Sequence, residues 1–517
     1  MLINIFCAKC EGIEAIPVTV EVDVITGIGI HLVGLADIAV KESLLRTMTA
    51  LQSMGFRIPG RKIVINLAPA DLHKSGSGYD IAIALGILAA SGQVSMPVLD
   101  KYMIMGELGL DGTIREIKGA LPIAALAAKE NLQGCILPEK SAMEAFGIDG
   151  VPIFGVKNLG EVLKILEGNE DCSTLLITSQ DKGEEKSEGI TNLNNVMDFE
   201  DIAGQVQAKR GMEIAAAGFH NILLIGPPGS GKSSLAQAVT KILPPMTKEE
   251  SIQTSKIYSV AGKAWQGRGL MKTRPFRAPH YTSSIPAIIG GGGDNIIPGE
   301  ISLAHNGIFF ADEFCEAPKR ILETLRGPLE DRKVTISRLH NKVDFPSNFM
   351  LIAATNPCPC GYWGEGDKCT CTPGRRNSYL SKLSGPLMDR IDLQIWMHPV
   401  PPSAFINSKK AESSAEIAKR VLKARTVQLD RFCNEGILTN SEMSLKQIRK
   451  YCPLDDHSQI FLEKTMEQTG ISARALTRII KIARTIADLE GSKDIKRRHL
   501  AEATGFRFLD KQLTELC

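Results

Sequence analysis

The chain has 517 residues, enough for about three domains, and its 44% hydrophobic and 23% charged residues are typical of globular proteins. Its 60 Lys and Arg against 58 Asp and Glu leave a net charge of +2, which excludes a globally basic nucleic-acid coat but not a local basic patch. Apolar runs such as 81–90 are too short to cross a bilayer, and the N-terminus lacks a signal-peptide pattern. We therefore expect a cytoplasmic protein without a membrane partner.

Residues 1–170 alternate strand-like and helix-like runs, which predicts a first α+β domain. Residues 62–67 alternate as in a strand, and residues 80–91 are apolar enough for a buried helix. The segment 171–197 is polar, charged and without periodicity, so we expect it to be a linker.

Residues 198–400 carry a phosphate-binding motif between a predicted strand at 221–225 and a predicted helix from 234. Glycines allow backbone N–H groups to approach phosphate oxygens, and the helix N-terminus adds a positive dipole end. Lys232 would reach the β- and γ-phosphates, and Ser233 would bind Mg²⁺. The predicted ATP-binding residues are Gly226, Pro227, Pro228, Gly229, Ser230, Gly231, Lys232, Ser233 and Ser234.

Two later apolar strands end in polar residues suited to phosphoryl transfer. The strand at 307–311 leads into Asp312, a candidate Mg²⁺ ligand, and Glu313, a candidate activator of the attacking water. The strand at 349–355 leads into Asn356, which could orient that water or simply cap the turn before Pro357.

Two arginines could supply positive charge to the transition state. Arg390 lies in the segment Asp-Arg-Ile-Asp, and Arg474 opens an amphipathic helix predicted over 473–489. Arginines in such segments are more often surface ion-pair partners, and both interpretations stay open on chemistry alone.

Four cysteines fall within residues 358–371, in a chain without an export signal. This clustering favours metal over disulfides, and four thiolates suit a tetrahedral structural Zn²⁺ without an open coordination position. Free buried thiols are the alternative. The predicted zinc ligands are Cys358, Cys360, Cys369 and Cys371.

Residues 332–345 alternate polar and apolar side chains around a short turn and predict a β-hairpin. Its Arg338 and Lys342 are candidate contacts to a phosphate backbone, as are Arg274 and Arg277 in the segment 271–298. Charges on a hairpin are more often a solvated face, so this alternative is kept. From residue 401 to 517 the pattern is helical.

The ordered set of these motifs resembles the AAA+ ATPases, and narrower stretches resemble the Mg-chelatase-like YifB/ComM family. Residues 198–205 resemble the AAA+ segment that packs near the adenine, and the narrower stretches are residues 274–280, 298–307 and 356–361. The resemblance implies an α/β fold, in which an AAA+ P-loop core is followed by a helical C-terminal lid. It also implies that Arg390 acts on a neighbouring subunit's ATP and that Arg474 is the sensor-2 residue, hence a homo-hexameric ring. The hairpin would then face DNA in the pore.

The first domain resembles the proteolytic domain of Lon at residues 67–71, 74–80, 105–115 and 136–140. Laying the motifs together puts Gly78 at the position of the nucleophilic Ser and Leu121 at that of the catalytic Lys. Neither can do that chemistry, so we expect a Lon-protease-like domain that does not cleave. A shifted dyad from Ser75, Ser77 and Lys118 is the alternative.

Three functions share this ATP site. The first is a ring-shaped DNA motor, a helicase or branch-migration enzyme in recombination, which in relatives of the resembled family serves natural transformation. The second is a Mg-chelatase-type motor subunit, and the third is a protein-remodelling ATPase. Fold-level resemblance alone does not decide among them.

Overall fold

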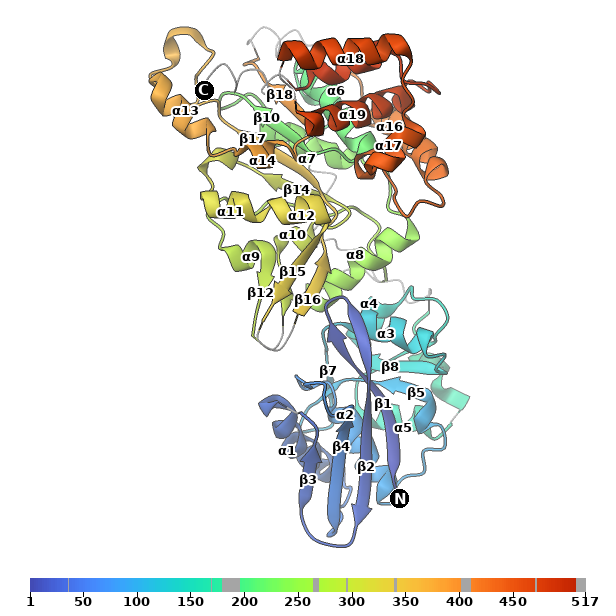
Figure 1. Ribbon diagram of the computed structural model, residues 1–517. Coiled ribbons are helices and arrows are strands. Elements are labelled where there is room, and N and C mark those ends of the chain that lie inside the picture. The colour runs from blue at the N-terminus through green and yellow to red at the C-terminus, as the bar shows by residue number, and fades with distance from the viewer. Residues whose placement is uncertain are drawn as a thin grey trace.

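The computed structural model describes residues 1–35, 37–168, 170–178, 196–263, 269–293, 296–338, 342–400, 411–469 and 472–507. Figure 1 shows two units stacked end to end, with the N-terminal unit below and the ATPase-like unit above. Most of the predicted linker, residues 179–195, lies outside the described residues, as do 401–410 at the start of the predicted lid.

The N-terminal unit is built on a seven-stranded mixed sheet in the order β3-β4-β2-β1-β5-β8-β9. Helix α2 (Asp80–Ala90) is buried along nearly its whole length, as its apolar sequence predicts. The strands are β1 (Ile3–Glu11), β2 (Glu14–Ile25), β3 (Ile30–Val33), β4 (Lys62–Ala68), β5 (Tyr102–Ile104), β8 (Gly134–Pro138) and β9 (Ile153–Val156). The other elements are α1 (Ile38–Ser53), α3 (Ala120–Lys129), α4 (Glu139–Ala145), α5 (Leu159–Leu166) and the short hairpin β6 (Glu107–Leu108) and β7 (Ile114–Arg115).

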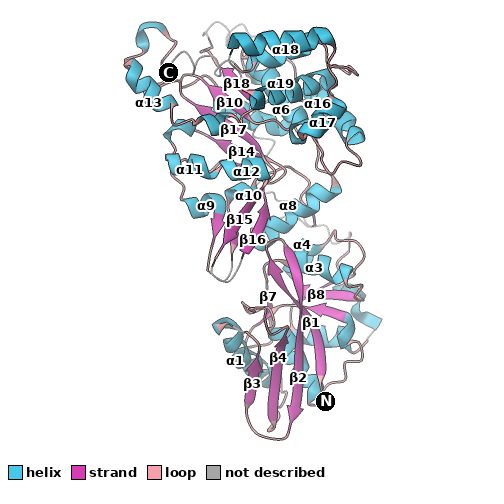
Figure 2. Ribbon diagram, in the orientation of Figure 1, coloured by secondary structure: helices cyan, strands magenta, loops and turns pink. Residues whose placement is uncertain are grey.

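The ATPase-like unit is built on a five-stranded parallel sheet in the order β11-β14-β17-β10-β18 (Figure 2). Every residue of the central strands β10 and β17 is buried, because helices cover both faces of a parallel sheet. The carboxyl ends of these strands meet at one edge, where the predicted site residues follow them. The strands are β11 (Phe276–Arg277), β14 (Ile308–Ala311), β17 (Met350–Thr355), β10 (Ile222–Ile225) and β18 (Leu393–Trp396).

Helices and two hairpins surround this sheet. The predicted hairpin is present as β15 (Lys333–Ser337) paired with β16 (Lys342–Pro346), and a second hairpin joins β12 (Gly290–Gly291) to β13 (Ile297–Pro298). The helices are α6 (Val206–Gly218), α7 (Lys232–Ala238), α8 (Lys248–Ala261), α9 (Ile285–Ile289), α10 (Glu300–Leu303), α11 (Lys319–Thr324), α12 (Arg326–Asp331), α13 (Pro373–Leu380) and α14 (Gly385–Met388).

The C-terminal region is helical. The predicted amphipathic helix is present as α19 (Ala473–Leu489), which has the predicted bounds and buries Ile479, Ile482 and Ile486 against neighbouring helices. The others are α16 (Ser414–Arg431), α17 (Leu445–Tyr451), α18 (Asp456–Thr469) and α20 (Arg497–Gly505). None of the helices that the structure describes is long and apolar enough to cross a membrane.

The two units meet where α3 packs against α8. The Ser259 carbonyl of α8 accepts a hydrogen bond from Gly119 N at 3.1 Å, and the Ser259 hydroxyl accepts one from Leu121 N at 3.3 Å. The turn between β1 and β2 also reaches the hairpin, since a Cβ added at Gly12 would lie 3.0 Å from the carbonyl oxygen of Asp344.

Candidate nucleotide-binding site

The phosphate loop connects β10 to α7 with two glycines in left-handed backbone conformations. Gly229 and Gly231 have φ angles of +76° and +88°, which residues with a Cβ rarely adopt. A Cβ at either position would meet no atom within 4 Å, so the space beside both glycines is open. The backbone is therefore shaped as a cradle for an anion.

Lys232 lies inside this cradle. Its Nζ donates hydrogen bonds to the carbonyls of Gly226 at 2.7 Å and Pro227 at 2.9 Å. Burial lowers the pKa of Lys232 to about 8, against the opposing effect of Asp312. An ammonium held in the loop by neutral oxygen acceptors can exchange them for phosphate oxygens.

The two predicted Mg²⁺ ligands lie side by side. The Ser233 hydroxyl at the start of α7 donates to the Asp312 carboxylate after β14 at 3.0 Å. A hydroxyl and a carboxylate are hard oxygen ligands of the kind Mg²⁺ prefers, so the pair fits the ion that accompanies ATP.

Glu313 and Asn356 complete the same edge of the sheet. Glu313 has a φ of +49°, an unusual conformation for a residue with a Cβ, and its side chain is exposed. The Asn356 side-chain oxygen lies 3.4 Å from Lys232 Nζ. The structure thus brings together the ends of three strands that are far apart in the sequence.

The predicted arginines lie close to each other, with partners outside the phosphate loop. Arg390 is paired with Glu330 and donates to the Pro386 carbonyl at 2.6 Å. Arg474, 72% exposed, lies 3.8 Å from Asp389. Burial lowers the pKa of Arg390, and the neighbouring charges of Arg326, Arg474 and Arg478 lower it further. This corner of the subunit is a cluster of arginines.

One buried network behind this cluster was not recognised in the sequence. Asp392, 1% exposed, is 2.5 Å from Arg478 of α19, 3.4 Å from His220, and accepts the Asn221 backbone N–H at 3.0 Å. Although burial acts to raise it, Arg478 and His220 hold the pKa of Asp392 well below its usual range. Because Asn221 also donates to the Arg390 carbonyl at 2.9 Å, the network connects the lid helix to the Arg390 loop.

The four predicted zinc ligands converge. All four sulfur atoms lie within 4.8 Å of one another, and those of Cys358, Cys360 and Cys369 are separated by 3.3, 3.7 and 3.8 Å. A tetrahedron with Zn–S bonds of about 2.3 Å has edges of about 3.8 Å, so the geometry fits Zn²⁺. The insertion also packs on the phosphate loop, since a Cβ at Gly361 would lie 2.8 Å from Pro228 Cδ.

The candidate DNA contacts divide into two groups. Arg338 donates to the Gly292 carbonyl at 3.3 Å, which ties the two hairpins together, and Lys342 is exposed at the start of β16. The tip between them, residues 339–341, lies outside the described residues.

Arg274 and Arg277 form ion pairs within the ATPase-like unit. Arg274 is nearly buried and paired with Glu250 at 2.8 Å, and Arg277 is paired with Glu300 at 2.6 Å. Contrary to our expectation, these two guanidinium groups are occupied by carboxylates of their own unit.

At the two positions where the resemblance to Lon places the Ser–Lys dyad, the N-terminal unit has Gly78 and Leu121. Leu121 is fully buried, Ser77 donates its hydroxyl to the Glu107 carboxylate, and the stem of Lys118 lies against Gly262 of the other unit. Hydrolysis by a shifted Ser77–Lys118 pair is therefore disfavoured.

A P-loop parallel sheet, a strand ending in Asp-Glu and a C-terminal helical lid define an AAA+ ATPase of the Mg-chelatase type. The family model described as magnesium chelatase, subunit ChlI, matches residues 198–405, and its C-terminal model matches 411–507. The model described as subunit ChlI of Mg-chelatase matches residues 20–141.

Within that class, the chain belongs to the YifB/ComM family. A YifB protein of Salmonella typhimurium is 40% identical over 513 residues, which are 98% of this chain and 97% of that protein. The competence protein ComM of Haemophilus influenzae is 40% identical over 516 residues, 99% of this chain and 98% of that protein. Lon protease 2 of Bacillus subtilis is 30% identical over 124 residues, 24% of this chain and 22% of the protease. The family and the fold predicted from the motifs are confirmed.

Proposed function

We propose that the chain is an ATP-driven DNA motor that works as a ring of six identical subunits. The observation that carries the proposal is the combination of a candidate ATP site, in which Ser233 lies beside Asp312, with a β-hairpin that presents Lys342 and Arg338. The ComM relative is named a competence protein, and we extend a role in DNA handling during competence to this chain.

Each ATP site would be completed by the next subunit. Arg390 and Arg474 find partners outside their own phosphate loop, as expected of residues that stabilise charge on a neighbour's ATP. Lys232 would hold the β- and γ-phosphates, Glu313 would take the proton of the attacking water, and Asn356 would orient that water. Ser233 and Asp312 would hold the Mg²⁺ that accompanies ATP, and the ion would supply positive charge beside the phosphate oxygens.

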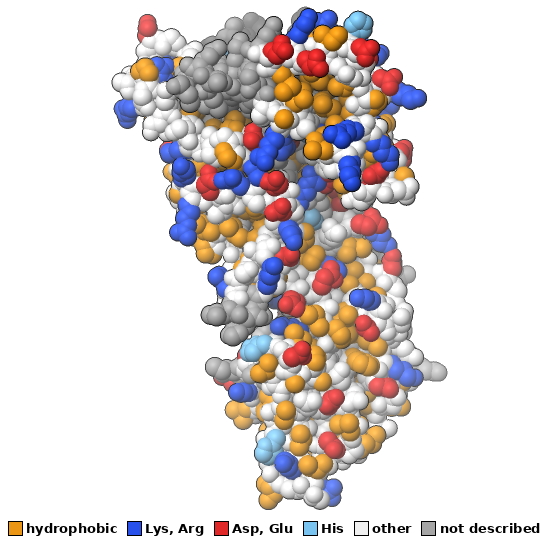
Figure 3. Space-filling model, viewed as in Figure 1, with side chains coloured by type: hydrophobic (Ala, Val, Ile, Leu, Met, Phe, Trp, Pro, Cys, Tyr) orange, Lys and Arg blue, Asp and Glu red, His pale blue; other side chains and the backbone are white. Residues whose placement is uncertain are grey.

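The DNA-facing element would be the β15–β16 hairpin. A cationic side chain that is not committed to a carboxylate can exchange counterions with a phosphate backbone. On the face seen in Figure 3, Lys and Arg are more frequent over the ATPase-like unit than over the N-terminal unit.

The structural Zn²⁺ of Cys358, Cys360, Cys369 and Cys371 would brace the phosphate loop through Gly361 and Pro228.

The test is ATP hydrolysis by the full chain with and without single-stranded, duplex and four-way-junction DNA. We expect DNA to stimulate turnover, the Lys232→Ala variant to lose all turnover, and the Lys342→Ala variant to lose the stimulation while keeping basal turnover. Lys333→Ala is the matched control, because Lys333 of the same hairpin is already paired with Asp344 at 2.9 Å.

A flat response to every DNA, with basal turnover intact, would contradict the motor proposal. The family models carry the name of a magnesium chelatase subunit, so this result would favour a chelatase-type motor subunit. A protein-remodelling ATPase is the remaining candidate.

A further inference from the structure

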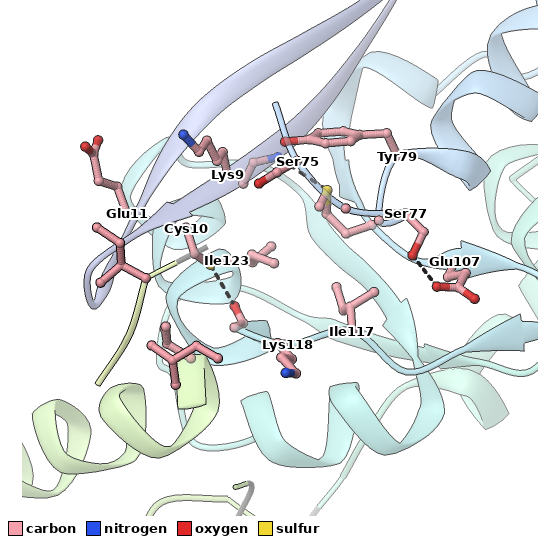
Figure 4. A pocket seen from close by; sticks show the side chains of 18 of the residues that line it. Lys9, Cys10, Glu11, Ser75, Ser77, Tyr79, Glu107, Ile117, Lys118 and Ile123 are labelled. Carbon is pink, nitrogen blue, oxygen red and sulfur yellow. Dashed lines mark hydrogen bonds between the residues drawn. The ribbon is translucent and has the colours of Figure 1, made fainter. Parts of the chain in front are cut away.

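A pocket of about 380 Å³ lies at the junction of the two units, apart from the ATP site. Figure 4 shows Lys9, Cys10 and Glu11 of β1 on one side and the Ser77–Glu107 pair on the other, with Lys118 below. Its size is in the range of ligand-binding pockets.

One wall of this pocket is the end of strand β1, whose edge on that side lacks a strand partner. In the described residues β1 is bridged to β5 only between Phe6 and Met103, and the Ala8 N–H that follows donates to the Met105 sulfur at 3.4 Å. Backbone groups alternate between the two edges of an antiparallel strand, so the N–H and C=O of Cys10 face the same way as those of Ala8. An open edge of this kind is a template for an added strand.

The ATPase-like unit supplies an apolar wall beside the turn that ends β1, where Val343 Cγ1 lies 3.1 Å from the Cβ position of Gly12. Val260 of α8, Ile297 of β13 and Val343 of β16 line it, and Ile117 and Met105 add apolar surface from the N-terminal unit. An occupant can therefore pair its backbone with β1 and bury alternate side chains against this wall.

The lining of the pocket gives a polyanion no excess of positive charge. It holds two ammonium groups, from Lys9 and Lys118, and three carboxylates, from Glu11, Glu107 and Glu116. Two of these carboxylates are paired with cations outside the lining, Glu107 with Arg115 at 3.5 Å and Glu116 with Lys140 at 2.6 Å, so the charges nearly balance.

We propose that this pocket binds an extended peptide segment of a partner protein, which adds to the β1 edge at Cys10. Main-chain hydrogen bonds to a strand edge give affinity, and pockets for alternate side chains give specificity. Since the Ser77 hydroxyl is held by Glu107 and Leu121 stands where a catalytic lysine would be needed, the peptide is bound and not cleaved.

The bound peptide would touch the hairpins as well as the N-terminal unit. Val343 directly follows Lys342 in β16, and Ile297 belongs to the hairpin that Arg338 ties to β15. The pocket therefore places a partner protein beside the elements proposed to contact DNA, although peptide binding itself does not depend on that proposal.

The experiment uses an array of short synthetic peptides probed with the full chain. The best binder is then labelled with fluorescein and titrated by anisotropy against wild type, Val260→Trp and Ile117→Trp. The first variant fills the pocket from the ATPase-like unit and the second from the N-terminal unit. Leu445→Trp, at an exposed lid position, is the matched control. Hydrogen exchange of the wild-type chain, with and without the peptide, measures how fast the Cys10 backbone N–H exchanges with solvent.

We expect peptides with alternating apolar residues to bind and to slow exchange at Cys10. Both pocket variants should bind roughly tenfold more weakly, while the control is unchanged. The proposal is overturned if no peptide binds, if the pocket variants bind as wild type does, or if the protected amides lie elsewhere. Loss of oligonucleotide binding in the pocket variants, with no peptide effect, would instead make this a DNA site. Should a variant fail to fold, the exchange result on wild type still decides.

Discussion

Replacing Asp392 by Asn tests whether the buried network connects the lid to the Arg390 loop. The carboxylate is 1% exposed and 2.5 Å from Arg478, whose side chain keeps 23% exposure. Removing one partner of a buried ion pair costs about 3–5 kcal/mol, and the partial exposure of Arg478 places this change at the lower end, about 3 kcal/mol. Asp344→Asn is the control, because its pair with Lys333 is about half exposed and worth at most about 1 kcal/mol.

The assay is urea unfolding followed by tryptophan fluorescence. The chain has three tryptophans, at 265, 363 and 396, all within the ATPase-like region, so the signal reports on that unit. The double variant Asp392→Asn/Arg478→Gln should be less destabilised than the sum of the single variants, by about 1–3 kcal/mol. Additive effects, or an Asp392→Asn variant as stable as Asp344→Asn, would refute the coupling.

Three further predictions follow from the site and the junction. Because burial in the phosphate loop lowers the pKa of Lys232 to about 8, ATP binding near that pH should take up a proton. Calorimetry in buffers of different ionisation enthalpy should detect this uptake, and Lys232→Ala should abolish it. Elemental analysis of the purified chain should find one Zn²⁺ per chain. The double variant Cys360→Ser/Cys369→Ser should lose the zinc and bind ATP more weakly. The control Cys433→Ser, at an exposed position, should keep both the zinc and the ATP affinity. Burial raises the pKa of Glu144 from 4.5 to about 7, so between these values the unfolded state releases a proton that the folded state keeps. The melting temperature should therefore fall as pH rises through this window, with Glu144→Gln showing a smaller change; equal slopes would contradict the assignment.

The nucleotide site was predictable because its signals are local. A phosphate loop, an Asp-Glu pair and an Asn each follow an apolar strand directly, and a parallel sheet brings such strand ends to one edge. The cysteine cluster was predictable for the same reason, since all four cysteines lie within fourteen residues. Helix α19 was predictable because its apolar residues recur at helical spacing.

The features that could not be predicted depend on contacts between distant residues. Asp392 meets Arg478 across 86 positions and His220 across 172, and only the fold brings them together. Likewise, the sequence around Arg274 gives no sign that its guanidinium forms an ion pair with Glu250 on α8. The peptide pocket requires two units, since neither β1 nor Val343 forms it alone.

The most direct test of the DNA-motor account is the ATP-dependent disassembly of a fluorescently labelled four-way junction by the purified chain. The account predicts separation of the labelled arms with ATP, none with a non-hydrolysable ATP analogue, and none with Lys232→Ala or Glu313→Gln. Intact junctions in the presence of a chain that hydrolyses ATP would contradict it.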